Sequence, residues 1–251
     1  MRKSAIIHIM QTAAEKAAYT LVRDFGELEK LQVSHKGFRN FVTSADRHTE
    51  ERIFRELSPA RPEFSFICEE SGFTERENKE TVWIVDPIDG TSNFMRGIPY
   101  FAINVALREK NTITAGITLD PMRGECYWAE IGQGAFVERN RLRVSGREEI
   151  REAVVATRAP IAVDEKLIHA GVILRKTGSI ALDMAYLAAG KYDAVIAYGA
   201  NLWDIASGIV IVKEAGGFVE TREEKDGYEV VASSSKKILD QLIKYTRAIE
   251  N

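Results

Sequence analysis

Residues 82–100 read VWIVDPIDGTSNFMRGIPY and join a strand-like run to a group of oxygen-bearing side chains. The apolar, largely β-branched run Val82–Val85 predicts a buried strand. Asp86 and Asp89 follow it, and the small residues GTSN come next. Carboxylates at a strand end, beside backbone N–H groups at a helix start, suit a hard cation and a phosphate. Two Asp residues also cap ordinary tight turns, so this stretch alone supports both interpretations equally.

The composition is that of an ordinary globular protein. The chain has 251 residues, 45% of them hydrophobic and 28% charged, which is enough to bury a large core. Its net charge of −3 gives no overall attraction to nucleic acid or an acidic membrane surface. Cys68 and Cys126 are too few for a disulfide framework. No apolar run reaches the length of about 18 residues that a membrane span needs, and we expect a cytoplasmic protein.

The N-terminal part is predicted to contain two helices and a strand. Apolar residues recur with helical spacing over residues 4–25, and Gly26 marks the end of that helix. Residues 37–43 indicate a turn followed by a short strand or bend. Ser44 or Asp46 then caps a second helix that stops before Pro59. Residues 64–68 are apolar and aromatic and predict a strand, and a polar loop over residues 73–81 leads to the central stretch.

The rest of the chain shows two successive patterns. Strands over residues 100–107, 112–119, 124–129 and 135–143 predict an antiparallel meander. From about residue 152 strands and helices alternate, which argues for a mixed or parallel sheet covered by helices. The predicted strands are 153–157, 172–174, 194–198, 218–220 and 228–232, and the predicted helices are 163–171, 179–190, 203–215 and 235–249. We expect subdomains 1–147 (α+β) and 148–251 (α/β) that form one compact unit.

Four acidic residues stand where an apolar strand or loop meets a turn or a helix start: Glu69, Asp86, Asp89 and Asp204. If their strands are neighbours, these carboxylates converge, and buried carboxylates stay ionised together only when cations neutralise them. Oxygen ligands without a His or Cys cluster favour Mg²⁺ or Mn²⁺ over Zn²⁺. Asp204 by itself is explained as a capping residue in the first turn of a helix, so the set of acids is more informative than any one of them.

Several motifs resemble the inositol monophosphatase family of Mg²⁺-dependent, lithium-sensitive phosphatases. The main ones are EESG at 69–72, WIVDPIDGTSNF at 83–94 and WDIASGIVIVKEAGG at 203–217. GQGAFVERNRLRVS at 132–145 and GSIALDMAYLAAGKYDA at 178–194 agree in the same order along nearly the whole chain. The resemblance implies a layered α-β-α-β-α sandwich, the sugar phosphatase fold of the α+β or α/β class, and a homodimer.

The resemblance also assigns roles to individual residues. It implies two or three Mg²⁺ ions, with Mn²⁺ as a substitute, held by Glu69, Asp86, the Ile88 carbonyl, Asp89 and Asp204. A metal-activated water would attack the phosphate ester in line, with Thr91, Asp46 and Glu69 as the catalytic group. The phosphate and substrate would contact Gly90, Thr91, Ser92, Ile180 and Asp204, and Lys36 and Thr43 would support the site.

Three positions depart from the pattern of inositol-using members. Asn40 replaces an acidic residue, Ile180 replaces a small one, and Ala197 stands where those members carry a Glu that binds sugar hydroxyls. We predict a hydrolase of a small phosphorylated polyol or sugar, with inositol 1-phosphate as the first candidate. Related members hydrolyse fructose 1,6-bisphosphate, histidinol phosphate or adenosine 3′,5′-bisphosphate.

An alternative of another class is a binding subunit of a transcription complex, as some bacterial members are. The basic stretch Arg139–Arg151 is the feature that favours it. Because Arg139, Arg141 and Arg143 alternate along a predicted strand, a solvated hairpin face explains them better than a nucleic-acid stripe. We therefore expect no nucleic-acid partner.

Overall fold

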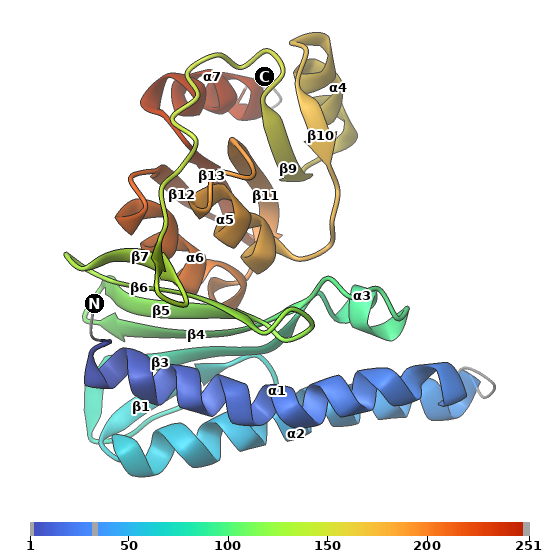
Figure 1. The fold of residues 1–251 in the computed structure, drawn as a ribbon, viewed down its shortest axis with the longest axis vertical. Helices are drawn as coiled ribbons and strands as arrows, with labels where there is room; N and C mark the ends of the chain where they lie inside the picture. The colour runs from blue at the N-terminus through green and yellow to red at the C-terminus, as the bar shows by residue number, and fades with distance from the viewer. Residues whose placement is uncertain (1–2, 32–34, 248–251) are drawn as a thin grey trace.

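The computed structural model describes residues 3–31 and 35–247, and the side chains of residues 28–43 lie outside its description. The chain folds into alternating layers of helix and sheet in the order α-β-α-β-α, as expected (Figure 1). One helix pair covers the outer face of the first sheet, a second pair lies between the two sheets, and a third pair covers the far face of the second sheet.

The first sheet has eight strands in the order β2-β1-β3-β4-β5-β6-β7-β8. Its strands are β1 (Phe64–Cys68), β2 (Gly72–Thr74), β3 (Asn78–Asp89), β4 (Ala102–Glu109), β5 (Thr112–Asp120), β6 (Glu125–Glu130), β7 (Gly134–Val137) and β8 (Asn140–Arg141). The pair β1–β3 is parallel, and β3 to β8 pair antiparallel in sequence order. The predicted meander is therefore present.

The second sheet has five strands in the order β10-β9-β11-β13-β12. They are β9 (Val154–Arg158), β10 (Ile173–Arg175), β11 (Ala194–Ala200), β12 (Phe218–Glu224) and β13 (Gly227–Ser233). The strands β10, β9 and β11 run parallel, whereas β13 and β12 run antiparallel. These pairings confirm the predicted mixed sheet. The helices between its parallel strands are the crossover connections that parallel pairing requires.

The helices of the described part are α1 (Ala5–Leu31), α2 (His35–Ala60), α3 (Thr91–Met95), α4 (Ile161–His169), α5 (Ile180–Ala188), α6 (Leu202–Glu214) and α7 (Lys236–Arg247). The pair α1–α2 covers the first sheet, α5 and α6 lie between the sheets, and α4 and α7 cover the second (Figure 1). None of these helices is long and apolar enough to cross a bilayer.

The N-terminal helices differ from the prediction. Helix α1 continues through Gly26 to Leu31, and α2 begins at His35, so the predicted turn and strand over residues 37–43 are wrong. Ser44 and Asp46 lie inside α2 instead of capping it, and Pro59 belongs to its last residues. A glycine inside a helix costs about 1 kcal/mol, which the packing of α1 along α2 can offset.

Two strand boundaries also differ. The predicted loop over residues 73–81 is shorter, because β2 ends at Thr74 and β3 already begins at Asn78, which leaves only residues 75–77 between them. The strand predicted over 135–143 is divided into β7 and β8 at Glu138, whose φ of 53° is left-handed. A left-handed residue interrupts the extended backbone, so the chain turns there into a short hairpin.

Helix α6 is seated closely against the first sheet. A Cβ added to Gly116 on β5 would lie 2.7 Å from the Cα of Ser207 on α6. The Ser207 hydroxyl lies 2.9 Å from the Thr118 hydroxyl and donates to the Asn104 side-chain oxygen over 3.1 Å. The absence of a side chain at Gly116 lets α6 approach, and the buried hydrogen bonds then fix its position along β4 and β5.

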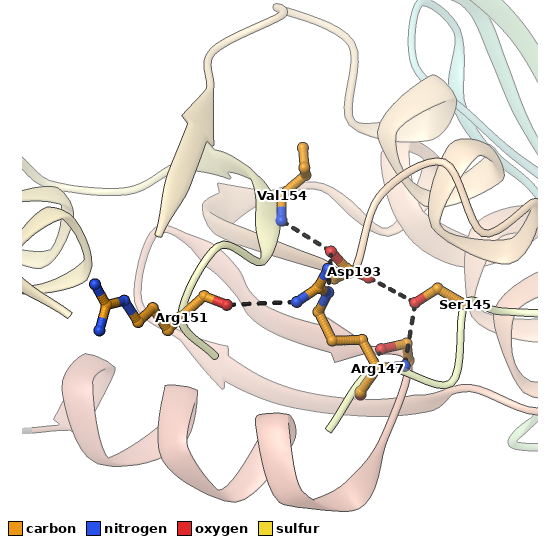
Figure 2. Close-up of polar contacts among 6 residues, drawn as sticks. Ser145, Arg147, Arg151, Val154 and Asp193 are labelled. Carbon is orange, nitrogen blue, oxygen red and sulfur yellow. Dashed lines mark hydrogen bonds and ion pairs between the residues drawn. The ribbon is translucent and has the colours of Figure 1, made fainter. Parts of the chain in front are cut away.

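The crossover segment, residues 142–153, connects the first sheet to the second. Asp193 ties this segment to β11 (Figure 2). The Asp193 carboxylate accepts hydrogen bonds from the Ser145 hydroxyl over 2.6 Å and from the Val154 N–H over 2.9 Å. Arg147 lies 3.4 Å from the same carboxylate and also donates to the Arg151 carbonyl. One buried acid thus joins the crossover segment, the start of β9 and the start of β11.

Candidate active site

The turn that ends β3 brings two carboxylates to one side. The pairing of β3 with β4 is irregular between Asp86 and Asp89, so these residues do not follow the strict alternation of a strand. The Ile88 N–H donates to the Asp86 Oδ1 over 3.0 Å and closes the turn. The tight turn closed by Asp86 is therefore also what brings the two carboxylates together.

Gly90 directs the chain from this turn into α3. Its φ of 98° is left-handed, and a Cβ there would meet the Tyr100 and Gly178 carbonyl oxygens at 3.2 and 3.3 Å. Only glycine fits this position without strain. The Thr91 hydroxyl then reaches back and donates to the Ile88 carbonyl over 3.0 Å, which leaves the hydroxyl oxygen able to accept another hydrogen bond.

Asp204 comes from the first turn of α6 and meets the acids of β3. Its Oδ2 accepts the Asn201 N–H over 3.1 Å, so Asp204 does cap its helix. Ligand oxygens of Asp86, Asp89 and Asp204 nevertheless lie within 4.8 Å of one another, and all three residues are buried. Capping therefore does not exclude Asp204 from the cluster.

Glu69 lies beside this group but outside the tight set of three. It follows β1, whose parallel register with β3 pairs Cys68 with Val85 and so brings Glu69 level with Asp86. The Glu69 N–H donates to the Val85 carbonyl over 3.2 Å, which holds Glu69 next to Asp86 across the two strands. Three of the four predicted acids therefore converge closely, and the fourth, Glu69, lies beside them on the neighbouring strand.

Burial perturbs the acids strongly in the protein without bound cations. It raises the pKa of Asp89 to about 8, and the neighbouring Asp204 charge adds to the rise. Burial likewise raises the pKa of Glu69 to about 7 and holds the pKa of Asp86 well above its usual range. Such a set is fully ionised at neutral pH only with cations among the carboxylates. Its ligands are all oxygens, which fits Mg²⁺ or Mn²⁺.

Asp46 lies on α2 near Glu69, the acid beside the cluster. It is buried, and its Oδ1 has no hydrogen-bond partner within the part of the chain that the structure describes. Burial, and then the charges of Glu70 and Glu69, raise the pKa of Asp46 to about 7. A buried oxygen without a partner beside the cluster is suited to hold a water.

Sequence analysis missed three residues that support the cluster. Ser179 donates its hydroxyl to Asp89, whose same oxygen accepts the Ala181 N–H over 2.9 Å. Glu50 on α2 accepts the N–H groups of both residues that follow Glu69, over 2.8 and 3.0 Å. The sequence offered a weak indication for each, since Ser179 belongs to a quoted motif and Glu50 lies one helical turn after Asp46.

The third missed residue is Arg158 at the end of β9, whose Nη2 lies 3.8 Å from the Asp204 Oδ2. Nothing in the sequence around it indicates a site. Of the other predicted residues, Ile180 is buried at the start of α5 and Ser92 is exposed on α3. The side chains of Lys36, Asn40 and Thr43 lie outside the described residues.

A cavity of about 580 Å³ lies elsewhere, between the β4–β5 turn and the residues Ile205, Ile209 and Lys213 of α6. Its lining includes none of the clustered acids. We therefore assign the candidate active site from the clustered carboxylates and not from this cavity. It lies at the ends of β1 and β3 and the start of α6.

Comparison with known proteins places the chain in a family along nearly its whole length. The model of the inositol monophosphatase family matches residues 2–251. The inositol-1-monophosphatase of Mesorhizobium japonicum is 44% identical over 229 residues, covering 87% of this chain and 86% of that protein. The Nus factor SuhB of Haemophilus influenzae is 33% identical and covers 95% of each chain.

Solved structures give the same result. The extragenic suppressor protein suhB from Bartonella henselae superposes with a TM-score of 0.86 at 36% identity, covering 98% of this chain and all of that one. An inositol monophosphatase from Anabaena gives a TM-score of 0.81 at 26% identity and covers 96% of this chain and 94% of that one. The chain therefore belongs to the inositol monophosphatase family and is a phosphoric monoester hydrolase.

Proposed function

We propose that this protein hydrolyses the phosphate monoester of a small polyol or sugar in a Mg²⁺-dependent reaction at the buried acid cluster. The observation that carries the proposal is the convergence of Asp86, Asp89 and Asp204 within 4.8 Å, from two distant parts of the chain. Burying three carboxylates without a cation is costly. A fold that nevertheless does so gains stability when a divalent ion is bound.

The roles of the residues follow from their positions. Asp86, Asp89, Asp204, Glu69 and the Ile88 carbonyl would hold the ions. Bound Mg²⁺ would lower the pKa of a nucleophilic water and offset charge on the phosphate and leaving-group oxygens. Ser179 and the Ala181 N–H orient the Asp89 carboxylate, so this ligand is preorganised.

Asp46 and Thr91 would orient the attacking water. The free Asp46 Oδ1 can accept a proton from it, and a pKa near neutrality suits that task. The Thr91 hydroxyl donates to the Ile88 carbonyl and so presents its lone pairs as acceptors. Backbone N–H groups of Gly90, Thr91 and Ser92, where α3 begins, would bind the phosphate oxygens.

Inositol 1-phosphate is the first substrate candidate, because relatives 44% identical carry the name inositol-1-monophosphatase. The buried Ala197 lacks the carboxylate with which inositol-using members bind hydroxyls. Losing one such hydrogen bond weakens binding by about 0.5–1.5 kcal/mol. Fructose 1,6-bisphosphate, histidinol phosphate and adenosine 3′,5′-bisphosphate are therefore included as alternative substrates.

A phosphate-release assay over these esters, with Mg²⁺ titrated from zero, tests the proposal. We expect release that saturates with Mg²⁺, that is retained with Mn²⁺ and that is inhibited by Li⁺. Asp204→Asn should lower kcat/KM at least about 100-fold, because a metal ligand is lost. Asp240→Asn on the exposed face of α7 is the matched control. Release that persists in EDTA, or full activity of Asp204→Asn, would refute the proposal.

A second candidate function is binding within a transcription complex. Relatives 33–35% identical carry the name Nus factor SuhB, and Arg139, Arg141 and Arg143 are exposed here. A gel shift with RNA at two salt concentrations, beside the phosphate-release assay, distinguishes the candidates. Binding without turnover of any ester would favour this second function. The homodimer is tested by light scattering on the purified protein.

A further inference from the structure

Arg158 occupies a distinctive place in the second sheet, at the carboxyl end of the parallel strand β9. The register pairs it with Ala197 on β11, one position beyond the pairs Val195–Ala156 and Ile196–Thr157. Side chains alternate along paired strands. Ala156, Val195 and Ala197 belong to the core that packs against α5 and α6, so Arg158 lies on this same face, toward the start of α6.

The guanidinium of Arg158 is held in place. Its Nε donates to the Tyr198 carbonyl over 3.2 Å, and its Nη2 donates to the Gly199 carbonyl over 2.7 Å. Nη2 also lies 3.8 Å from the Asp204 Oδ2. The side chain is 48% exposed, and Nη1 has no partner among the residues that the structure describes. A fixed guanidinium thus lies beside Asp204 of the acid cluster with donor capacity left over.

Holding cations does not explain this arrangement. A positive charge beside Asp204 competes with a metal ion for the same carboxylate and repels the ion when it binds. An arginine here therefore opposes metal binding to some extent. It can offset that cost by attracting something negative, and a guanidinium binds phosphate and carboxylate groups through paired hydrogen bonds.

We propose that Arg158 binds a second anionic group of the substrate, a phosphate or a carboxylate carried by the alcohol part of the ester. This inference rests on the proposed function, because it names the substrate class of the same site. The neighbouring position explains the preference. Ala197 offers no acceptor for sugar hydroxyls, and Arg158 offers only donors, so this wall selects anionic substrates over neutral polyol esters.

Matched substrate pairs test the inference. Fructose 1,6-bisphosphate against fructose 1-phosphate varies a second phosphate, and glycerate 3-phosphate against glycerol 3-phosphate varies a carboxylate. We expect the wild type to prefer the more anionic member of at least one pair by about 10- to 100-fold in kcat/KM, the range of charge-assisted hydrogen bonds. The pair that shows the preference identifies the anion.

Variants then assign the preference to Arg158. Arg158→Gln should reduce the ratio within that pair at least about 10-fold, and Arg158→Lys should restore part of it, because charge returns without the paired geometry. Arg139→Gln, an exposed arginine near the β7–β8 turn, should leave the ratio at the wild-type value. Midpoints of thermal unfolding confirm that each variant is folded.

The outcomes separate this inference from the proposed function. Phosphate release from the esters without a preference in either pair, or an unchanged ratio in Arg158→Gln, would overturn the role of Arg158 alone. No release from any ester at saturating Mg²⁺ would overturn both. A purely electrostatic role beside Asp204 would shift the Mg²⁺ concentration for half-maximal activity and leave the ratio unchanged, which also counts against the inference.

Discussion

Replacing Asp89 by Asn should stabilise the metal-free protein while it removes Mg²⁺-dependent activity. The Asp89 oxygen that accepts from Ser179 and Ala181 can be replaced by the Asn amide oxygen, so these contacts are retained. The variant removes a buried carboxyl that the metal-free fold must either protonate or keep ionised at a cost. It loses a metal ligand by the same change, so stability and function should move in opposite directions.

The magnitude follows from the pKa of Asp89, which burial and Asp204 raise to about 8. In the unfolded chain the group titrates near its usual value of about 4. A raised pKa favours the protonated folded form, so the penalty is absent below pH 4 and grows as pH rises to about 8. At about 1.4 kcal/mol per pKa unit, the upper limit at pH 8 is about 5 kcal/mol.

Neighbouring acids reduce the expected gain. The other carboxyls of the cluster have raised pKa values as well, and part of the repulsion can be relieved by protonating them. We therefore expect Asp89→Asn to gain about 2–4 kcal/mol at pH 8 and about 1 kcal/mol at pH 5. For a chain of this size the gain at pH 8 corresponds to an increase of about 5–10 °C in Tm.

Calorimetry in EDTA at the two pH values measures this difference, with Asp240→Asn as the control for loss of a surface acid. Excess Mg²⁺ at pH 8 should raise the Tm of the wild type and leave that of Asp89→Asn nearly unchanged, because binding stabilises only a protein that retains the site. A variant less stable than the wild type in EDTA at pH 8, or a gain equal at both pH values, would refute the reasoning.

Four further substitutions have defined outcomes. Asp46→Asn should lower kcat about 100-fold with less than a threefold change in the Mg²⁺ concentration for half-maximal activity; a large change in that concentration would instead make Asp46 a metal ligand. Gly116→Ala should cost about 1–3 kcal/mol in urea unfolding because its Cβ meets Ser207, whereas Gly26→Ala, with open space around it, should stabilise by up to about 1 kcal/mol. Asp193→Ala should cost about 2–3 kcal/mol in the same assay, because the N–H of Val154 loses a charged acceptor.

Local patterns predicted most of the elements. The strand in Val82–Val85, the antiparallel meander and the later strand-helix alternation depend on alternation and turn residues, which short stretches of sequence contain. The N-terminal helices did not follow. Gly26 and the stretch 37–43 carry strong local indications of helix ends, but the long contact between α1 and α2 outweighs them, and no single stretch of sequence records such a contact.

The residues of the candidate site also fall into two groups, those that a short stretch of sequence indicates and those that it does not. Asp86 and Asp89 share one turn, so a short motif could indicate them. Glu69 and Asp204 were indicated by their places where apolar stretches end, and the family resemblance then assigned them as metal ligands. Arg158 and Ala197 are 39 positions apart in sequence and become neighbours only through the register of β9 with β11. Register is a property of the assembled sheet, and a sequence without relatives aligned to it contains no indication of this pair.

The acid cluster also links the packing of the layers to their chemistry. Asp86 and Asp89 belong to the first sheet, and Asp204 belongs to the helix that lies between the sheets. The distance between them depends on how deeply α6 is seated, which the close approach at Gly116 and the hydrogen bonds of Ser207 determine. Repulsion among the ionised acids pushes α6 away from β3, and bound cations would reverse that force. The packing of α6 onto the sheet therefore opposes the repulsion among the acids, and ion binding would add to the stability of the fold.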